Sequence, residues 1–190
     1  MAALIFLLIP LAPLLLLFVL IPLTRPHRST IPLKSRHVLI TGGSSGIGLS
    51  LATLAALEGA SKVSILARNP TKLADARDRI RLATGVDVAI LSADVRDYGE
   101  VMRAVEEAGP VDVLVCNQGV FVPRELEGQG IEEVREMVEV NLMGCFHLVK
   151  AVLPGMRRTR RERGPGAIAF VSSQAGQVRI IGVWDRLGFD

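Results

Sequence analysis

The sequence predicts an α/β fold in which a doubly wound parallel sheet of about five strands follows an N-terminal transmembrane helix. Short apolar runs alternate with helix-like stretches from residue 37 onward, which is typical of parallel strands joined by right-handed helical crossovers. A glycine-rich turn from Gly42 to Gly48 joins the first apolar run to the first helix-like stretch. An uncharged apolar segment at residues 2–23 precedes them.

The N-terminal segment is the first element of the chain. Residues 2–23 carry no charged side chain and are long enough to cross a hydrocarbon core as a helix, in which prolines are tolerated. Basic side chains follow it, and such residues favour the cytosolic side of a membrane helix. We therefore expect an anchor at 1–23, a basic, proline-rich linker at 24–36, a lumenal N-terminus and a cytosolic domain. A cleaved signal peptide and a re-entrant hairpin are the alternatives.

The domain after the linker is expected to span 37–176, where strand and helix patterns alternate. The expected strands are 37–41, 62–67, 86–92, 111–116 and 167–172. They are short and apolar, as parallel strands buried on both faces are. The expected spatial order is 3-2-1-4-5, so a ligand would bind beyond the carboxyl ends of the strands, at the switch point between strands one and four.

Four helices are expected between the strands, at 47–58, 70–83, 98–108 and 131–153. Gly59 and Gly85 follow the first two, and glycine is preferred just past a helix end. Gly109-Pro110 and Pro154-Gly155 are expected to end the third and fourth. The arginines between positions 157 and 163 would then lie in a loop, either solvated or attracted to anionic lipid headgroups.

The composition excludes several classes of function. A net charge of +3 is too small to indicate a nucleic-acid partner. The two cysteines, Cys116 and Cys145, lie in apolar runs and are expected to be buried and reduced. The sequence has no CxxC motif and no Cys/His cluster, so no metal is expected.

The glycine-rich turn predicts a phosphate site. Its spacing is TGxxxGxG, with Gly42, Gly46 and Gly48. Glycines allow a close approach of the backbone to a ligand, and the free N–H groups and dipole of a helix N-terminus favour an anion. Ser44 and Ser45 add hydroxyl groups in the same turn.

The end of the second strand predicts which dinucleotide binds. A carboxylate at this point would bind the ribose 2′-hydroxyl of NAD, but the sequence reads Leu66-Ala67-Arg68-Asn69. Arg68 can pair with a 2′-phosphate, and Lys72 follows on the same side of the next helix, which favours NADP(H). The alternative is that both cations are merely solvated.

Two further strand ends carry polar residues. Asp94, before Val95, could accept a hydrogen bond from an adenine amino group, or could cap the next helix together with Asp97. The turn Asn117-Gln118-Gly119 is expected to pass close to the cofactor, with Gly119 permitting the approach. Alternatively, Asn117 only holds neighbouring strands together by amide hydrogen bonds.

The fourth helix and the fifth strand each present one candidate for chemistry. Asn141 falls on the apolar stripe of the helix and is either a satisfied core amide or a functional residue. Ser173 follows the fifth strand and could hydrogen-bond a substrate carbonyl, or could serve turn chemistry alone. The stripe consists of Val134, Met137, Val138, Leu142, Cys145 and Val149.

These motifs together resemble the short-chain dehydrogenase/reductase family, whose fold is Rossmann-like. The matching pieces are Thr41-Gly42 with Gly46-Ile47-Gly48, Asp94-Val95, Asn117-Gln118-Gly119, Val140-Asn141-Leu142 and Val171-Ser172-Ser173. Together with the apolar anchor, several longer segments resemble the plant-type 3-ketodihydrosphingosine reductases. These segments are ITGGSSGIG, SILARN, SADVRDY and VSSQAGQ. The resemblance implies NADPH-dependent reduction of a sphingoid-base ketone, 3-dehydrosphinganine, to sphinganine on the cytosolic face of the endoplasmic reticulum membrane.

The resemblance also implies roles for individual residues. Ser173 would position the ketone, and Asn141 would support a proton-relay water. NADPH would be held by Gly42, Ser44, Ser45, Gly46, Ile47, Gly48, Arg68, Lys72, Asp94, Val95, Asn117 and Gly119.

The sequence departs from the family pattern in its tail. The family's Tyr-x-x-x-Lys would place its tyrosine at position 186 and its lysine at position 190, where Arg186 and Asp190 stand. The one tyrosine of the chain is Tyr98. We therefore expect a divergent tail at 177–190, as a splice variant or truncated gene model would produce, and no ketone reduction by residues 1–190 alone. The alternative function is an inactive, membrane-anchored NADPH-binding fragment or scaffold, forming a homo-oligomer or pairing with full-length enzyme.

Overall fold

The computed structural model describes residues 16–18, 20 and 31–173. The chain divides into two compact units, Met1–Ile31 and Pro32–Asp190. In the first unit, Leu16, Leu17, Phe18 and Leu20 are helical, while the rest of the predicted anchor lies outside the described residues. The predicted divergent tail lies outside them too. The membrane anchor therefore stays a prediction.

The second unit contains a five-stranded parallel sheet in the order β3-β2-β1-β4-β5. The predicted order is confirmed, although β3 and β4 begin later than expected and β5 ends earlier. Within the described residues, β5 is an edge strand. The strands are β1 His37–Thr41, β2 Lys62–Ala67, β3 Ala89–Ser92, β4 Val113–Cys116 and β5 Ala167–Phe170.

Helices connect the strands, and their ends follow local sequence. Asn69 caps one helix by accepting a hydrogen bond from the Lys72 amide at 3.0 Å, and Pro70 occupies the first turn. Asp97 caps the next in the same way, accepting from the Glu100 amide at 2.9 Å. The helices are α3 Gly46–Leu57, α4 Pro70–Thr84, α5 Tyr98–Ala108, α6 Ile131–Val138 and α7 Gly144–Arg163, with a 3₁₀ turn, η1, at Leu126–Gly128 and a π turn, η2, at Glu139–Met143.

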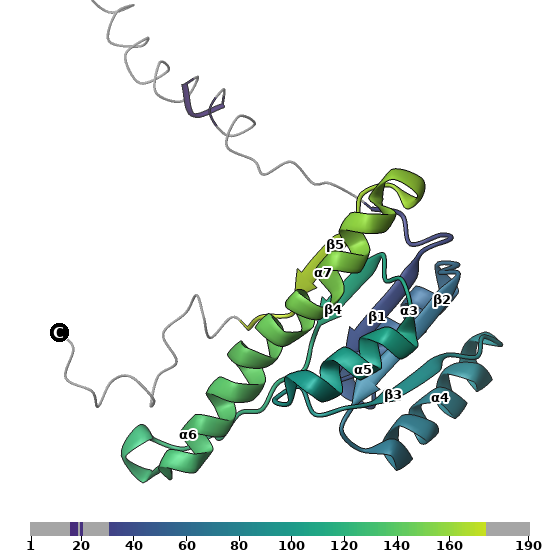
Figure 1. The fold of residues 1–190 in the computed structure, drawn as a ribbon. Coiled ribbons are helices and arrows are strands. Elements are labelled where there is room, and N and C mark those ends of the chain that lie inside the picture. The colour runs from purple at the N-terminus through teal and green to yellow at the C-terminus, as the bar shows by residue number, and fades with distance from the viewer. Residues whose placement is uncertain (1–15, 19, 21–30, 174–190) are drawn as a thin grey trace, which may run out of the picture. The chain divides into compact units, whose positions relative to one another are not determined.

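The sheet separates two apolar cores, and successive side chains of β1 point into different ones. Val38 and Ile40 pack with residues of α3 and α4. Leu39 belongs to the other core, with residues of α5 and α7 such as Leu148. Figure 1 shows α5 and α7 crossing the same face of the sheet. This alternation explains why β1 is apolar throughout, because a strand covered on both faces has no solvated side.

The fourth helix continues beyond its predicted end. Pro154 lies inside α7, which runs to Arg163, so the prediction that Pro154-Gly155 ends it was wrong. Met156, beyond the proline, is buried in the core to which α5 also contributes, and such packing overrides the local preference of proline. The arginines at 157–163 consequently lie on a helix, not in a loop.

The stretch Ile131–Arg163 is the one segment of the described residues that is long and apolar enough to cross a membrane. Leu148, Val152 and Met156 of this stretch are buried in the domain core. Core helices of globular domains meet the same criterion, so the stretch does not by itself indicate a membrane span.

The apolar stripe predicted on this helix coincides with its buried face only in part, since Cys145 and Val149 pack against the core. Val138 and Leu142 are about half exposed, at 48% and 53%, whereas Val140 and Leu148 are buried. The π turn at Glu139–Met143 interrupts the α-helical register here, because its extra residue rotates the face that follows by about 100° relative to a continuous α-helix. A sequence pattern with a constant α-helical period therefore misplaces residues such as Leu142.

Candidate active and cofactor-binding site

The glycine-rich turn adopts a conformation that side chains would obstruct. Gly42 and Gly46 have positive φ angles of +63° and +54°, which favour glycine. A Cβ on Gly48 would lie 2.3 Å from the Gly42 carbonyl oxygen and 2.5 Å from the Asn117 amide nitrogen. The turn thus packs tightly against β4 and exposes the first residues of α3, including Ile47, which is 63% exposed.

A hollow of about 420 Å³ opens at the carboxyl ends of the strands, which we call the cofactor hollow. It brings together most of the predicted cofactor residues, from Gly42 on the turn to Arg68 and Lys72 after β2. Gly46, Gly48 and Asp94 are not part of its lining. The predicted residues in its wall are Gly42, Ser44, Ser45, Ile47, Arg68, Lys72, Val95, Asn117 and Gly119.

Asn117 and its neighbours join β4 to β1 beneath this hollow. The Asn117 side-chain amide donates to the Thr41 carbonyl at 3.0 Å, and the Asn117 backbone amide donates to the Thr41 hydroxyl at 3.0 Å. The Thr41 hydroxyl donates in turn to the Gln118 side-chain oxygen. Asn117 therefore holds neighbouring strands together and also lines the hollow, while its contact with a cofactor stays a prediction.

Thr41 and Gln118 lie in motifs that the sequence predicted, but their side-chain roles were not assigned from it. Gln118 lines the cofactor hollow and reaches α7, where its side-chain nitrogen lies 3.3 Å from the Cys145 sulfur. Thr41 is fully buried, and a hydroxyl in an otherwise apolar strand needs a partner. A single threonine in an apolar strand therefore already indicates, from the sequence, a side chain with a hydrogen-bonding role.

A second hollow, of about 620 Å³, lies between β5 and α7, and we call it the apolar hollow. Asn141 and Ser173, the two predicted catalytic residues, both line it, together with apolar side chains such as Phe146 and Phe170. The segment Asn117–Gly119 contributes to both hollows. The structure thus brings the predicted ketone site next to the predicted cofactor site.

Asn141 is held rigidly although it is not buried. Its side-chain nitrogen donates to the Val120 carbonyl at 2.8 Å, and its side-chain oxygen accepts from the Val120 amide at 2.9 Å. The residue is exposed and lies in the π turn. The alternative of a core amide is therefore wrong, because the same turn that displaced the apolar stripe moved Asn141 to the surface of the apolar hollow.

Asp94 is engaged by a neighbouring arginine. The guanidinium of Arg96 donates from Nε and Nη2 to the two carboxylate oxygens, with the shortest distance at 2.6 Å. These hydrogen bonds are the main reason that the pKa of Asp94 is lowered. Asp97 caps α5, and the side chain of Glu100 accepts from the Asp94 amide. A contact between Asp94 and adenine stays a prediction.

The two cysteines differ in their exposure. Cys116 is 2% exposed and Cys145 is partly buried, and both are free thiols. Burial, with Cys145 as a neighbour, raises the pKa of Cys116 to about 12. Cys116 therefore stays a protonated thiol at neutral pH and is not a nucleophile. Full burial is confirmed for Cys116 only.

The strand order, the glycine-rich turn and the hollow at the switch point define a nucleotide-binding α/β domain of the doubly wound class. The family model for short chain dehydrogenases matches residues 36–184, and the chain belongs to this family.

Curated proteins are similar to this chain in sequence. The chain is 60% identical over 161 residues to the 3-dehydrosphinganine reductase TSC10B of Arabidopsis thaliana, covering 85% of this chain and 48% of that protein. It is 36% identical over 176 residues to the 3-dehydrosphinganine reductase of Danio rerio, covering 88% of this chain and 51% of that protein. The chain thus spans about half the length of these relatives.

The L-sorbose reductase from Gluconobacter frateurii, solved with NADPH and L-sorbose, is similar in structure. The TM-score is 0.64 at 31% identity, over 74% of this chain and 54% of that one.

Proposed function

We propose that this chain binds NADPH and serves the reduction of 3-dehydrosphinganine to sphinganine in sphingolipid biosynthesis. The observation that carries the proposal is the position of Arg68 and Lys72, which line the same hollow as the glycine-rich turn. The turn is suited to a pyrophosphate, because a Cβ at Gly48 would collide with the Gly42 carbonyl oxygen and distort the turn. The names of the curated relatives support the substrate, and the NADPH-bound sorbose reductase supports the cofactor.

The residues of this chain would divide the work between the two hollows. The turn Gly42–Gly48 would hold the pyrophosphate, and Arg68 would pair with the 2′-phosphate by charge-assisted hydrogen bonds. NADPH, when bound, supplies the hydride that reduces the ketone. Ser173 would donate a hydrogen bond to the ketone oxygen, and Asn141, fixed by Val120, would hold a water for proton transfer.

A second candidate function follows from the question of which group donates the proton to the product alcohol. A developing alkoxide needs an acid, yet Arg186 stands where the family pattern has tyrosine. Tyr98 lines neither hollow, and its ring lies 5.2 Å from the Lys150 ammonium. These observations favour an NADPH-binding chain without turnover, a scaffold that forms a homo-oligomer or pairs with full-length enzyme.

The deciding experiment measures binding and turnover separately on the purified full chain. Calorimetry is expected to give NADPH binding at least about tenfold tighter than NADH binding. A spectrophotometric assay with 3-ketodihydrosphingosine is expected to give no substrate-dependent NADPH oxidation. Binding with oxidation would establish the reductase in this chain, and equal affinity for the two cofactors would contradict the NADPH assignment.

We further propose a single-pass location in the endoplasmic reticulum membrane with the domain in the cytosol. The support is the uncharged segment 2–23 followed by Arg25, Arg28, Lys34 and Arg36. Alkaline carbonate should leave the chain in the membrane fraction, and a glycosylation sequon should be modified at the N-terminus but not at the C-terminus. Release into the soluble fraction, or modification of the C-terminal sequon, would contradict this topology.

A further inference from the structure

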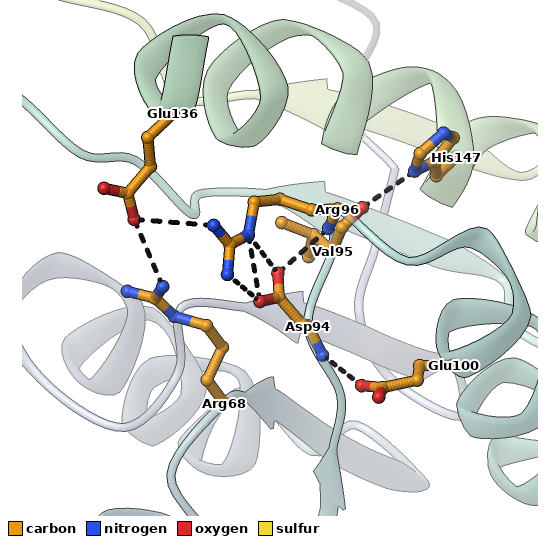
Figure 2. A network of polar contacts seen from close by, with 7 residues as sticks. All are labelled: Arg68, Asp94, Val95, Arg96, Glu100, Glu136 and His147. Carbon is orange, nitrogen blue, oxygen red and sulfur yellow. Dashed lines mark hydrogen bonds and ion pairs between the residues drawn. The ribbon is translucent and has the colours of Figure 1, made fainter. Parts of the chain in front are cut away.

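The carboxylate of Glu136 joins two arginines that come from different turns at the carboxyl edge of the sheet (Figure 2). One oxygen, Oε1, lies 3.4 Å from Nη1 of Arg68 and 3.9 Å from Nη1 of Arg96. Arg68 follows β2, Arg96 follows β3, and Glu136 lies on α6. The carboxylate therefore links α6 to the side of the cofactor hollow where Arg68 lies.

The two arginines depend on Glu136 to different degrees. Arg96 is already committed to Asp94 by three hydrogen bonds of 2.6 to 3.1 Å. Within residues 31–173, the guanidinium of Arg68 makes one hydrogen bond, the 3.4 Å bond to Glu136. Arg68 is thus the arginine that is free to change partner, and Glu136 is the group that it would leave.

We propose that Glu136 is an internal counter-ion of Arg68 that the 2′-phosphate of NADPH displaces, which makes Glu136 a specificity-determining residue of the cofactor hollow. This inference rests on the proposed function, because it assumes that Arg68 receives the 2′-phosphate. A carboxylate and a phosphate are both oxyanions that accept the same forked donors of a guanidinium. The bound phosphate would therefore take the place of the carboxylate.

Because the pair is exposed, replacing the Glu136 carboxylate by a phosphate at Arg68 costs little free energy. The side chains of Arg68 and Glu136 are 52% and 42% exposed, and exposed ion pairs are weak. A 2′-hydroxyl carries no charge and leaves the pair intact, whereas a phosphate must compete with Glu136 and tolerate its negative charge nearby. Removing that charge should therefore strengthen binding of a 2′-phosphate and leave ligands without one unchanged.

Glu132 offers a matched control on the same helix. Its carboxylate lies 2.8 Å from Nη1 of Arg135 and is 75% exposed, and it makes no ion pair with Arg68 among the described residues. Glu132→Gln changes the net charge by the same amount as Glu136→Gln. A difference between the two variants therefore reports the local pair and not the overall charge.

The test is calorimetric titration of the full chain with adenosine 2′,5′-bisphosphate and with 5′-AMP, which lacks the 2′-phosphate. Glu136→Gln is expected to bind the bisphosphate about three- to tenfold tighter than wild type at about 50 mM salt. Glu132→Gln should stay within about twofold of wild type, as should 5′-AMP on every variant. The gain should shrink at about 500 mM salt, where exposed charges are screened.

Each other outcome overturns the proposal in a recognisable way. Unchanged or weaker bisphosphate binding by Glu136→Gln, with wild-type binding intact, would overturn the counter-ion alone and leave the proposed function standing. An equal gain in bisphosphate affinity for Glu132→Gln, or an equal gain in 5′-AMP affinity for Glu136→Gln, would also overturn the counter-ion alone. No bisphosphate binding by folded wild type, with an unfolding transition verified by circular dichroism, would overturn the proposed function and this inference together.

Discussion

The cofactor hollow and the apolar hollow share one wall, Asn117–Gly119, but they are built differently. The cofactor hollow is formed by turns that follow β1, β2, β3 and β4, and backbone geometry at Gly42 and Gly48 shapes it. The apolar hollow lies beside the edge strand β5 and is lined by side chains such as Phe146 and Phe170, which are 62% and 58% exposed.

The difference indicates that nucleotide binding and ketone binding make different demands on the fold. A phosphate is recognised by backbone N–H groups and by one or two cations, all supplied by short segments next to the switch point. An apolar substrate needs an enclosed surface, and contiguous exposed apolar side chains mark a surface that another group covers. Changes at the two hollows should therefore have separable effects.

The largest effect is expected at Gly48, under the cofactor hollow. Gly48→Ala would place a methyl group 2.3 Å from the Gly42 carbonyl oxygen, so the turn must shift. We expect the free energy of unfolding to fall by about 3 kcal/mol and NADPH binding to weaken at least about 100-fold. Urea unfolding and calorimetry measure the two changes.

Gly155→Ala is the matched control in α7, because a Cβ there meets no atom within 4 Å. Alanine is favoured over glycine inside a helix, so this variant should be more stable by about 0.5–1 kcal/mol with unchanged NADPH affinity. Equal behaviour of the two alanine variants would contradict the tight packing of the turn.

The second-largest effect is expected on NADPH affinity when the positive charge of Arg68 is removed from the cofactor hollow. Arg68→Gln removes the cation proposed to meet the 2′-phosphate, and NADPH affinity should fall about 10- to 100-fold while NADH affinity stays within about twofold. Arg81→Gln is the control, because Arg81 lies on α4 and pairs with Asp78 at 3.4 Å, outside the hollow. A similar loss for both cofactors would mean that Arg68 acts on the fold and not on the phosphate.

Sequence patterns predicted the cofactor hollow more completely than the apolar one, for a physical reason. Glycine spacing, polar strand ends and the lack of an acidic residue at the end of the second strand are local features of the sequence, and parallel strands bring local turns to one edge. The strand order and most of the hollow's lining were therefore accessible from sequence. The side-chain roles of Thr41 and Gln118 were not predicted, because their hydrogen bonds join segments far apart in the chain.

The predictions for the fourth helix failed where packing overrode local preference, although Asn141 and Ser173 do line the apolar hollow as expected of a shared site. The π turn at Glu139–Met143 places Asn141 and Leu142 outside the expected buried stripe. Pro154 was expected to end a helix that continues to Arg163, with Met156 buried beyond the proline. Neither a π turn nor a tolerated proline has a signal in an α-helical periodicity, so the side-chain arrangement along this helix required the structure.

The third effect concerns stability at a site that lines neither hollow. His37 Nδ1–H donates to the Pro110 carbonyl and Nε2 accepts from the Ser64 hydroxyl, each at 2.8 Å. Burial is the main reason that its pKa is lowered from 6.5, with Lys62, Asp112 and Arg163 as the charged groups nearby. The unfolded chain therefore binds a proton more readily than the folded one just below pH 6.5.

It follows that the free energy of unfolding should decrease as the pH falls from about 7 to 5, by at most about 1.4 kcal/mol per pH unit. His37→Gln should flatten this slope in urea titrations at several pH values. NADPH affinity in wild type should not follow the same pH profile. An identical slope in the variant would assign the pH dependence to another group.

The smallest effect on binding is expected in the apolar hollow. Phe146→Ser removes an exposed apolar side chain, so the free energy of unfolding should change by less than about 0.5 kcal/mol and NADPH affinity by less than about twofold. Self-association, measured by sedimentation velocity, should decrease because the hollow loses apolar surface. Phe121→Ser, at a side chain that is 72% exposed and lines neither hollow, should leave self-association unchanged. A loss of NADPH affinity in Phe146→Ser would show that the two hollows are coupled through their shared wall.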